Sequence, residues 1–112
     1  MSRRGDIVQL RHRIGFGPKG KPEAVVLVQA GPLIAALPTV LVVPLDSAVA
    51  SFAGDPSCVP VSAREAGGTE HVAVVTQLRP VRVDALEPAA HGHLGRGTMK
   101  ALERALKLVL GL

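Results

Sequence analysis

The sequence predicts a mainly β domain of roughly five to seven strands with a C-terminal helix, an α+β fold. Short aliphatic runs are separated by Gly- and Pro-rich segments, which is typical of strands joined by turns. Only the last segment shows the three- and four-residue apolar spacing of an amphipathic helix. A chain of 112 residues has room for one hydrophobic core, so residues 1–112 are expected to form a single domain.

The first two strands are expected on either side of a glycine-rich loop. Residues 6–13 have the side-to-side alternation of a strand. Residues 15–20 contain three glycines and Pro18, so they form a loop whose backbone could approach a ligand closely. Residues 23–30 are almost unbroken aliphatic and are too short and too valine-rich for a buried helix. They are predicted to be a central strand.

The third strand is expected after an apolar connector. The connector, 33–37, follows Gly31-Pro32, which ends the second strand. The strand itself covers 39–45, and Pro44 marks its end, an edge or a bulge because proline donates no ladder hydrogen bond. A second loop is expected over 46–57.

The second half of the chain contains shorter strands. Residues 58–63 and 71–77 are predicted to form a strand pair around the turn at 64–68. A further short strand is expected at 80–83. The segment 84–97, with a proline and three glycines, is expected to be irregular.

The chain is predicted to end in an amphipathic helix. Thr98 fits its N-cap, and Gly111 fits its stop. The charged residues of this segment lie mostly opposite the apolar stripe. The stripe consists of Met99, Leu102, Leu106 and Val109.

Positive charge is concentrated at the start of the chain. The first twenty-one residues hold six of the thirteen Lys and Arg residues and a single acid, Asp6, so they sum to +5 while the remaining residues sum to −1. A field this localised can attract polyanions although the rest of the chain is nearly neutral. The six cations are Arg3, Arg4, Arg11, Arg13, Lys19 and Lys21.

The composition restricts how a nucleic acid could be recognised. The chain has no Trp or Tyr and only two Phe residues, whereas binders of single-stranded nucleic acid usually stack bases on aromatic rings. Cys58, the one cysteine, excludes an internal disulfide and is expected to be a buried strand thiol. No segment has the pattern of a membrane span or a secretory signal, so a cytoplasmic protein without a membrane partner is expected.

Short segments along nearly the whole chain follow an order and spacing that is moderately specific for one protein family. They are Arg4-Gly5-Asp6-Ile7-Val8, Lys21-Pro22 with Ala24-Val25-Val26-Leu27-Val28, Val43-Pro44-Leu45-Asp46-Ser47, Gln77-Leu78-Arg79 with Val81 and Leu86, and His93-Leu94-Gly95 with Met99 and Leu108-Val109-Leu110-Gly111-Leu112. Taken together, they resemble the MazF/PemK family of toxins, whose fold is shared with CcdB.

The resemblance implies a fold, an activity and partners. The implied fold is a small SH3-like, CcdB-like β-barrel. Members of the family are typically homodimers that cut single-stranded RNA at short sequences, without a metal or another cofactor, and are inhibited by a cognate antitoxin. Such an endoribonuclease, or mRNA interferase, uses the 2′-hydroxyl of RNA as nucleophile, so the protein must supply a base, an acid and cations for the charged phosphorane.

The resemblance also implies site residues, and two of them depart from the family's pattern. The family's loop arginine is matched by Lys21, and its threonine at the strand end is matched by Asp46 with Ser47 beside it. Lysine stabilises phosphate as a point charge without the bidentate fork of arginine, so Arg13 or Arg11 is expected to supply the guanidinium. The catalytic candidates are Lys21, Asp46, Ser47 and Arg13, the RNA-binding candidates are Arg11, Lys19 and Gln77, and no metal site is expected.

Several candidates also have a structural interpretation. Asp46 could act as a general base, or it could form a turn or a helix cap. Lys19 and Lys21 could contact phosphate or could only keep an exposed loop solvated. His12 lies between two arginines and could act as a base, but strand alternation turns it to the opposite face from them.

Two other functions stay open at the level of sequence. Residues 43–48 also resemble the gyrase-inhibiting CcdB branch, although the C-terminus of that branch bears a tryptophan and this chain ends Leu110-Gly111-Leu112. A non-catalytic relative that keeps the fold and binds an antitoxin would explain the departures at Lys21 and Asp46. The apolar residues 31–38 suggest a dimer face or a groove for an antitoxin peptide, or they pack onto the core.

Overall fold

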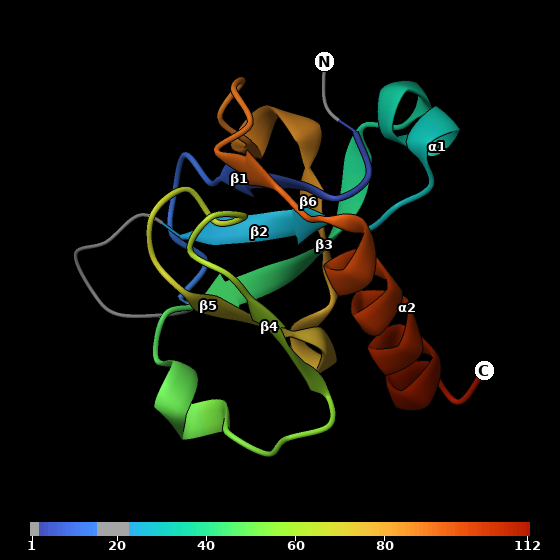
Figure 1. Ribbon diagram of the computed structural model, residues 1–112. Helices are drawn as coiled ribbons and strands as arrows, with labels where there is room; N and C mark the ends of the chain where they lie inside the picture. The colour runs from blue at the N-terminus through green and yellow to red at the C-terminus, as the bar shows by residue number, and fades with distance from the viewer. Residues whose placement is uncertain (1–2, 16–22) are drawn as a thin grey trace.

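Antiparallel strands curl into a half-barrel, with one long helix lying against it, as Figure 1 shows. The computed structural model describes residues 3–15 and 23–112. The strands are β1 (Asp6–Gln9), β2 (Ala24–Leu27), β3 (Thr39–Asp46), β4 (Cys58–Val61), β5 (His71–Val74), β6 (Arg79–Arg82) and β7 (Gly92–His93). The helices are α1 (Gly31–Ala36) and α2 (Arg96–Leu110), and the 3₁₀ turns are η1 (Val49–Phe52), η2 (Val75–Gln77) and η3 (Val83–Ala85). The strand order in this part of the chain is β4-β5-β3-β2-β1-β7, with β6 paired to β3, which confirms the predicted fold class.

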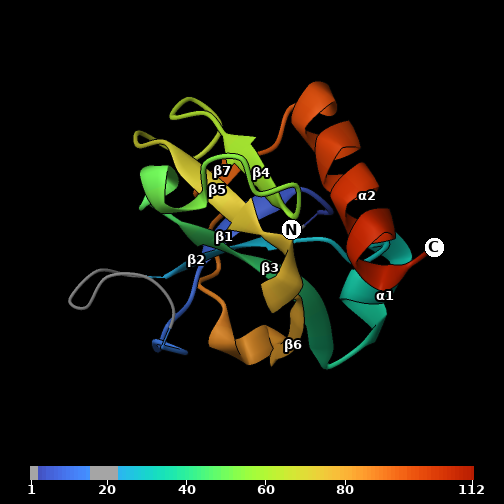
Figure 2. The ribbon, with the colours of Figure 1, turned by 90° about the horizontal axis from the view of Figure 1, so that it is seen from below.

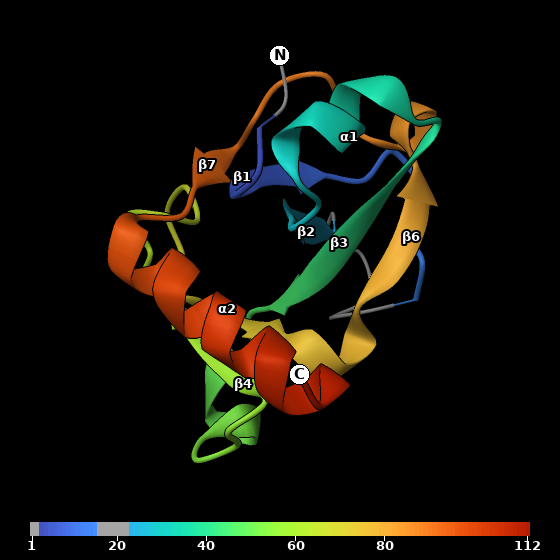
Figure 3. The same ribbon diagram turned by 90° about the vertical axis from the view of Figure 1, so that its right-hand side faces the viewer.

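β2 lies in the centre of the sheet, between β1 and β3. Both of its faces are buried, which explains why the segment is aliphatic throughout. Val26 belongs to a core cluster that includes Leu102 of α2, and Val25 belongs to a second cluster that includes Ile34 of α1. Figure 3 shows the strands β2 and β3 between the two helices. The prediction of a central strand is confirmed.

Pro44 lies where β3 changes partner along one edge. On that edge β6 pairs with residues 39–42, and β5 pairs with Leu45 and Asp46. β2 pairs along the opposite edge. Because proline has no N–H, it leaves the ladder open at the change. Pro44 therefore marks a change of partner inside a buried strand, and not the end, edge or bulge that the sequence led us to expect.

The first strand is shorter than predicted. β1 ends at Gln9, and the predicted continuation over residues 10–13 is wrong. After an isolated bridge at Leu10, the backbone N–H of Arg11 donates to the carbonyl of Ala85 at 2.9 Å. The chain thus leaves β2 and turns toward η3, because tertiary pairing decides where an alternating pattern stops being a strand.

Three later boundaries also differ from the predictions. The strand expected over 71–77 ends at Val74, and Gln77 lies in η2. The strand expected at 80–83 is β6, which begins one residue earlier. The segment 84–97 contains β7, which pairs with β1. These pieces are held by long-range pairing, which a local sequence pattern does not encode.

The apolar connector contains a short helix, α1. Pro32 stands in its first turn, where the fixed φ and the missing N–H of proline are tolerated. Ile34 is buried, whereas Leu33 and Leu37 are 48% and 44% exposed. A helix this short gives too few repeats for its period to be recognised in the sequence.

α2 begins earlier than predicted and stops where predicted. Its N-cap is Gly95, not Thr98. Glu65, from the turn between β4 and β5, accepts hydrogen bonds from the Gly95 N–H at 2.6 Å and from the Thr98 hydroxyl at 3.0 Å. Gly111 ends the helix in a left-handed conformation with φ of 71°, which glycine adopts without strain. In residues 3–15 and 23–112 no helix has the length and apolar character needed to cross a membrane.

Candidate functional site

Four strand ends meet at one edge of the sheet. Gln9 of β1 lies opposite Ala24 of β2, and Ala24 lies opposite Leu45 of β3. Asp46, the last residue of β3, lies opposite a residue near the start of β5. β1 and β3 therefore end, and β2 and β5 begin, at the same edge. Residues 11–15 and Glu23, together named the loop base, are attached to this edge.

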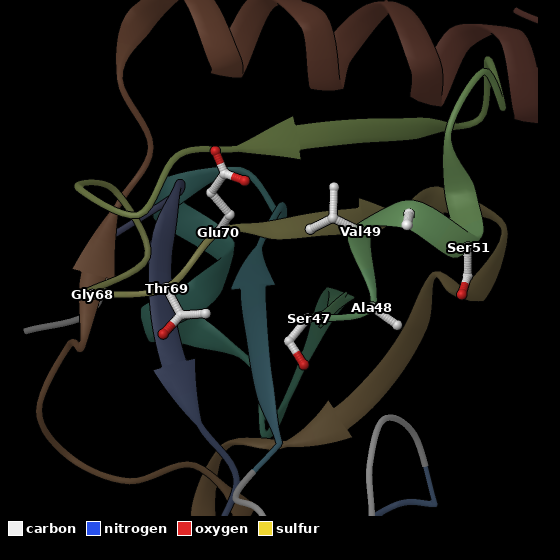
Figure 4. Close-up of a pocket in the computed structure, with 8 residues that line it drawn as sticks. Ser47, Ala48, Val49, Ser51, Gly68, Thr69 and Glu70 are labelled. Carbon is white, nitrogen blue, oxygen red and sulfur yellow. The ribbon is translucent and has the colours of Figure 1, made fainter.

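An open pocket of about 640 Å³ lies beside the end of β3, as Figure 4 shows. Its walls are residues 47–51, which lead from β3 into η1, and residues 68–70, which precede β5. In Figure 2 the green η1 turn and the start of β5 lie at the same end of the sheet. The volume falls in the range of small-molecule sites. This corner pocket is lined by Ser47, Ala48, Val49, Ala50, Ser51, Gly68, Thr69 and Glu70.

Asp46 shapes one wall of the corner pocket. Its Oδ1 accepts the backbone N–H of Ala48 at 2.7 Å, and the N–H of Val49 donates to the carbonyl of Ser47 at 2.9 Å. This is the side-chain-supported turn that aspartate commonly forms after a strand. The geometry supports the turn interpretation of Asp46, and it places Ser47 in the pocket wall.

Hydroxyl groups and one carboxylate give the corner pocket its polar character. Ser47, Ser51 and Thr69 are neutral, and among the described lining residues Glu70 alone is charged. A carboxylate repels a phosphate, but it accepts hydrogen bonds from the amino groups of nucleobases. The pocket therefore suits a group that donates hydrogen bonds. Of these lining residues, Ser47 was identified from the sequence as a candidate and Glu70 was not.

The loop base holds an arginine next to a buried carboxylate. Glu23 is 6% exposed, and its side chain accepts the backbone N–H of Ile14. The Nη2 atom of Arg13 lies 4.0 Å from Oε2 of Glu23. Arg13 therefore lies within ion-pair distance of an acid that the sequence interpretation treated only as the first residue of a strand. The available signal was an acid at the start of an aliphatic run, beside a cationic loop.

Arg11 is directed elsewhere. Its Nε donates to the carbonyl of Leu86 at 3.1 Å, and its charge helps to lower the pKa of Asp84, after the larger effect of Arg82. Arg11 and Arg13 thus have different partners although they alternate in sequence. Lys19 and Lys21 lie outside the described residues.

Gln77 is not brought together with the corner pocket in this chain. It is exposed in η2, at the opposite end of β5 from residues 68–70. Its Oε1 accepts a hydrogen bond from Nη2 of Arg79 at 2.9 Å. His12 is exposed at the loop base.

Two further side chains of reactive types, His93 and Cys58, lie in surroundings that favour a structural role. His93 donates from Nδ1 to Oδ1 of Asp6 at 2.7 Å, and Asp6 is only 3% exposed. Burial, and then the negative charge of Asp55, raises the pKa of the Cys58 thiol, which favours the unreactive protonated form. Over residues 3–15 and 23–112 no group of three or more His, Cys, Asp or Glu side chains could hold a metal ion.

Comparison with known protein families gives one match that spans almost the whole chain. Residues 3–110 match the PemK-like, MazF-like toxins of type II toxin-antitoxin systems. No match is found among curated protein sequences.

Solved structures of the same fold come from mycobacteria and Deinococcus. An endoribonuclease in complex with its cognate antitoxin from a mycobacterial species has a TM-score of 0.80 and 17% identity, over 100% of this chain and 97% of that chain. The Mycobacterium tuberculosis toxin MazF-mt6 has a TM-score of 0.77 and 20% identity, over 96% and 97%. The MazE-MazF structure from Deinococcus radiodurans has a TM-score of 0.76 and 14% identity, over 99% and 96%. At these identities the structures show a shared fold.

Proposed function

The chain belongs to the PemK-like, MazF-like toxins of type II toxin-antitoxin systems, and from this premise we propose that it is a sequence-specific, metal-independent endoribonuclease. The observation that carries the proposal is the meeting of the loop base and the corner pocket at one edge of the sheet. The loop base offers Arg13 for a phosphate, and the corner pocket offers hydrogen-bond acceptors for a base. A nucleotide needs both kinds of partner side by side.

The proposed reaction is attack of the RNA 2′-hydroxyl on the adjacent phosphorus. The protein must then remove one proton, return one to the leaving oxygen and stabilise the negative phosphorane. We assign Arg13 and Lys21 to the phosphorane charge, and Asp46 or Ser47 to the proton at the 2′-hydroxyl. Lys19 and Arg11 extend the cationic surface. Because the nucleophile belongs to the substrate, the reaction needs RNA.

The test is cleavage of a long natural transcript by the purified protein in EDTA. Sequencing the 5′ ends of the fragments is expected to show cuts at one short sequence. An oligonucleotide with that sequence and a single 2′-deoxynucleotide at the cut should resist cleavage. If the transcript stays intact over its whole length, the protein is not this enzyme.

A second candidate function is that of a non-catalytic member that binds an antitoxin. The observation that favours it is the hydrogen bond from Ala48 to Asp46, which gives the carboxylate a turn-forming role where the family's pattern has threonine. An inactive parent that gains RNA cleavage in the Lys21→Arg, Asp46→Thr double variant would support this function. A parent that cleaves RNA by itself excludes it.

We further propose a cognate antitoxin as partner, as in the mycobacterial and Deinococcus complexes. The proposed site is the glycine-rich loop that carries Lys19 and Lys21, together with two exposed leucines, Leu33 of α1 and Leu37 directly after it. An acidic peptide on the loop would compete with RNA there. Because RNA and antitoxin would be met in the cytoplasm, we place the protein in that compartment.

We also propose that the protein is a homodimer. Beside an apolar groove of about 220 Å³ between β4 and α2, Leu108 is 60% exposed. Leu112 is 87% exposed just beyond α2. Exposed leucines next to an apolar groove are typical of a surface that another chain covers.

A further inference from the structure

Glu23 connects the two sides of the loop base. Its backbone carbonyl accepts the N–H of Leu10 at 2.8 Å, which extends the pairing of β1 and β2 by one residue. Its side chain accepts the N–H of Ile14, and its Oε2 lies 4.0 Å from Nη2 of Arg13. The carboxylate of Glu23, which follows the glycine-rich loop, therefore contacts Arg13 and Ile14, which precede that loop.

A carboxylate is not required at this position for the strand pairing. The backbone bond to Leu10 uses the carbonyl of Glu23, which every residue type has. Burying a charge is costly unless it is paired and hydrogen-bonded, and here the side chain of Glu23 is 5% exposed. Besides accepting the Ile14 N–H, the carboxylate brings a negative charge within 4.0 Å of the Arg13 guanidinium.

Holding Arg13 in advance has a catalytic consequence. Arginine has a long, flexible side chain, and a cation that is already oriented stabilises a transition state without further reorganisation. The Arg13 side chain is 33% exposed, so its guanidinium is partly covered while it still reaches solvent. Arg11 cannot take the same place while its Nε is bound to Leu86.

We propose that Glu23 is a positioning residue: its buried carboxylate orients the Arg13 guanidinium toward the scissile phosphate of RNA. The proposal rests on the proposed endoribonuclease function and deepens it. It assigns the bidentate phosphate contact to Arg13. Lys21 cannot make that contact, because its ammonium lacks the forked donors of a guanidinium.

The first experiment is a double-mutant cycle on RNA cleavage. Glu23→Gln keeps the side-chain shape and an acceptor for the Ile14 N–H, but it removes the charge. We expect kcat to fall about ten-fold and KM to change less than about two-fold, because the lost orientation acts in the transition state. Arg13→Ala should lower kcat at least as much. In the Arg13→Ala background, Glu23→Gln should change kcat by less than about two-fold.

The matched control is Glu103→Gln, which breaks another Arg–Glu pair far from the loop. Glu103 lies on α2, and its Oε2 is 2.9 Å from Nη1 of Arg4. This variant should keep kcat within about two-fold of the parent. The proposal is wrong if Glu23→Gln lowers kcat by the same factor with and without Arg13, or if it leaves kcat unchanged.

A second experiment needs no catalytic activity. In ¹⁵N NMR spectra of the parent at low temperature, the Nη2–Hη2 group of Arg13, which faces Glu23 and is assigned by its loss in Arg13→Ala, should give a resolved and slowly exchanging signal. Glu23→Gln should make its hydrogen exchange about ten-fold faster, since the ion pair is gone. Equal exchange in both proteins would overturn the positioning role. If the parent cuts no RNA, the proposed function fails, and this measurement still decides whether Glu23 holds Arg13.

Discussion

Glu65 shows how much of this fold depends on single carboxylates. Its Oε1 accepts the hydroxyl of Ser62 and the hydroxyl of Thr98, each at 3.0 Å. Its Oε2 accepts the N–H of Gly95 at 2.6 Å. One side chain therefore closes the turn after β4 and caps the first turn of α2, a role that the sequence pattern had assigned to Thr98.

Replacing Glu65 by Ala should destabilise the protein. The substitution removes the acceptor for the Gly95 N–H and for two hydroxyls, so we expect the free energy of unfolding to fall by about 2 kcal/mol. Urea denaturation measures it. Glu70→Ala, in the same turn but exposed, should change the stability by less than about 0.5 kcal/mol. Equal losses for the two variants would contradict the capping role.

The same carboxylate should make stability depend on pH. Burial alone would raise the pKa of Glu65, but hydrogen bonds from Gly95, Thr98 and Ser62 outweigh it and hold the pKa below its usual value of 4.5. A lowered pKa in the folded state stabilises the fold above the unfolded pKa, and this contribution disappears as pH falls through the folded pKa.

The measurement compares the parent with Glu65→Gln from pH 7 down to acid. The difference in their free energies of unfolding should be constant near neutrality and should shrink as pH falls below about 4.5. Asp55 and Asp84 also have lowered pKa values, but they are present in both proteins and cancel. A difference that grows in acid would show that the direction is wrong.

Residue types indicated part of the candidate site. Asp46 and Ser47 were identified by resemblance, and both lie at the corner pocket or its edge. Glu23 and Glu70 were missed, because an acid in a sequence carries no sign of burial or of its neighbours. The assigned roles remain predictions for the RNA-cleavage experiments.

At the scale of elements, β7 depends on close approach of two backbones. A Cβ on Gly92 would lie 1.9 Å from the carbonyl oxygen of Glu65. The neighbouring His93 N–H donates to that same carbonyl at 3.2 Å. Only glycine lets β7 pass here, which explains why a segment expected to be irregular can join the sheet.

Gly92→Ala should therefore be strongly destabilising. The new methyl group must displace backbone, so we expect the free energy of unfolding to fall by about 3 kcal/mol. Gly97→Ala is the matched control, because a Cβ there meets nothing within 4 Å and alanine favours the helix. It should leave stability unchanged or raise it by about 0.5 kcal/mol. Thermal denaturation of both variants tests the contrast, which a mild effect of Gly92→Ala would contradict.

At the scale of the whole molecule, two exposed apolar surfaces are candidates for interfaces with other chains. One is at α1, with Leu33 in the helix and Leu37 just after it, and the other is at the end of α2, with Leu108 in the helix and Leu112 just beyond it. The α2 surface is the more exposed and lies next to the groove beside β4. We therefore expect the dimer face at α2 and keep α1 for the antitoxin.

Leu108→Asp should turn the proposed dimer into a folded monomer. A charge on the proposed face opposes association, and because aspartate is unfavourable in the last turn of a helix, we expect the monomer to lose about 1 kcal/mol of stability and still fold. Sedimentation equilibrium should give half the parent's mass for Leu108→Asp and the parent's mass for Leu33→Asp. The reverse pattern would place the interface on α1, and a monomeric parent would remove the dimer proposal.

The sequence alone determined the fold class, the central position of β2, the C-terminal helix with its stop at Gly111, and the concentration of positive charge near the start. These follow from local properties: burial on two faces requires an aliphatic run, and a left-handed helix end favours glycine. Tertiary structure decided the rest. It set the partner change at Pro44, the cap of α2 and the pairing of Arg13 with Glu23. Such contacts join residues from different elements, and their free energy depends on which groups the folded chain brings together.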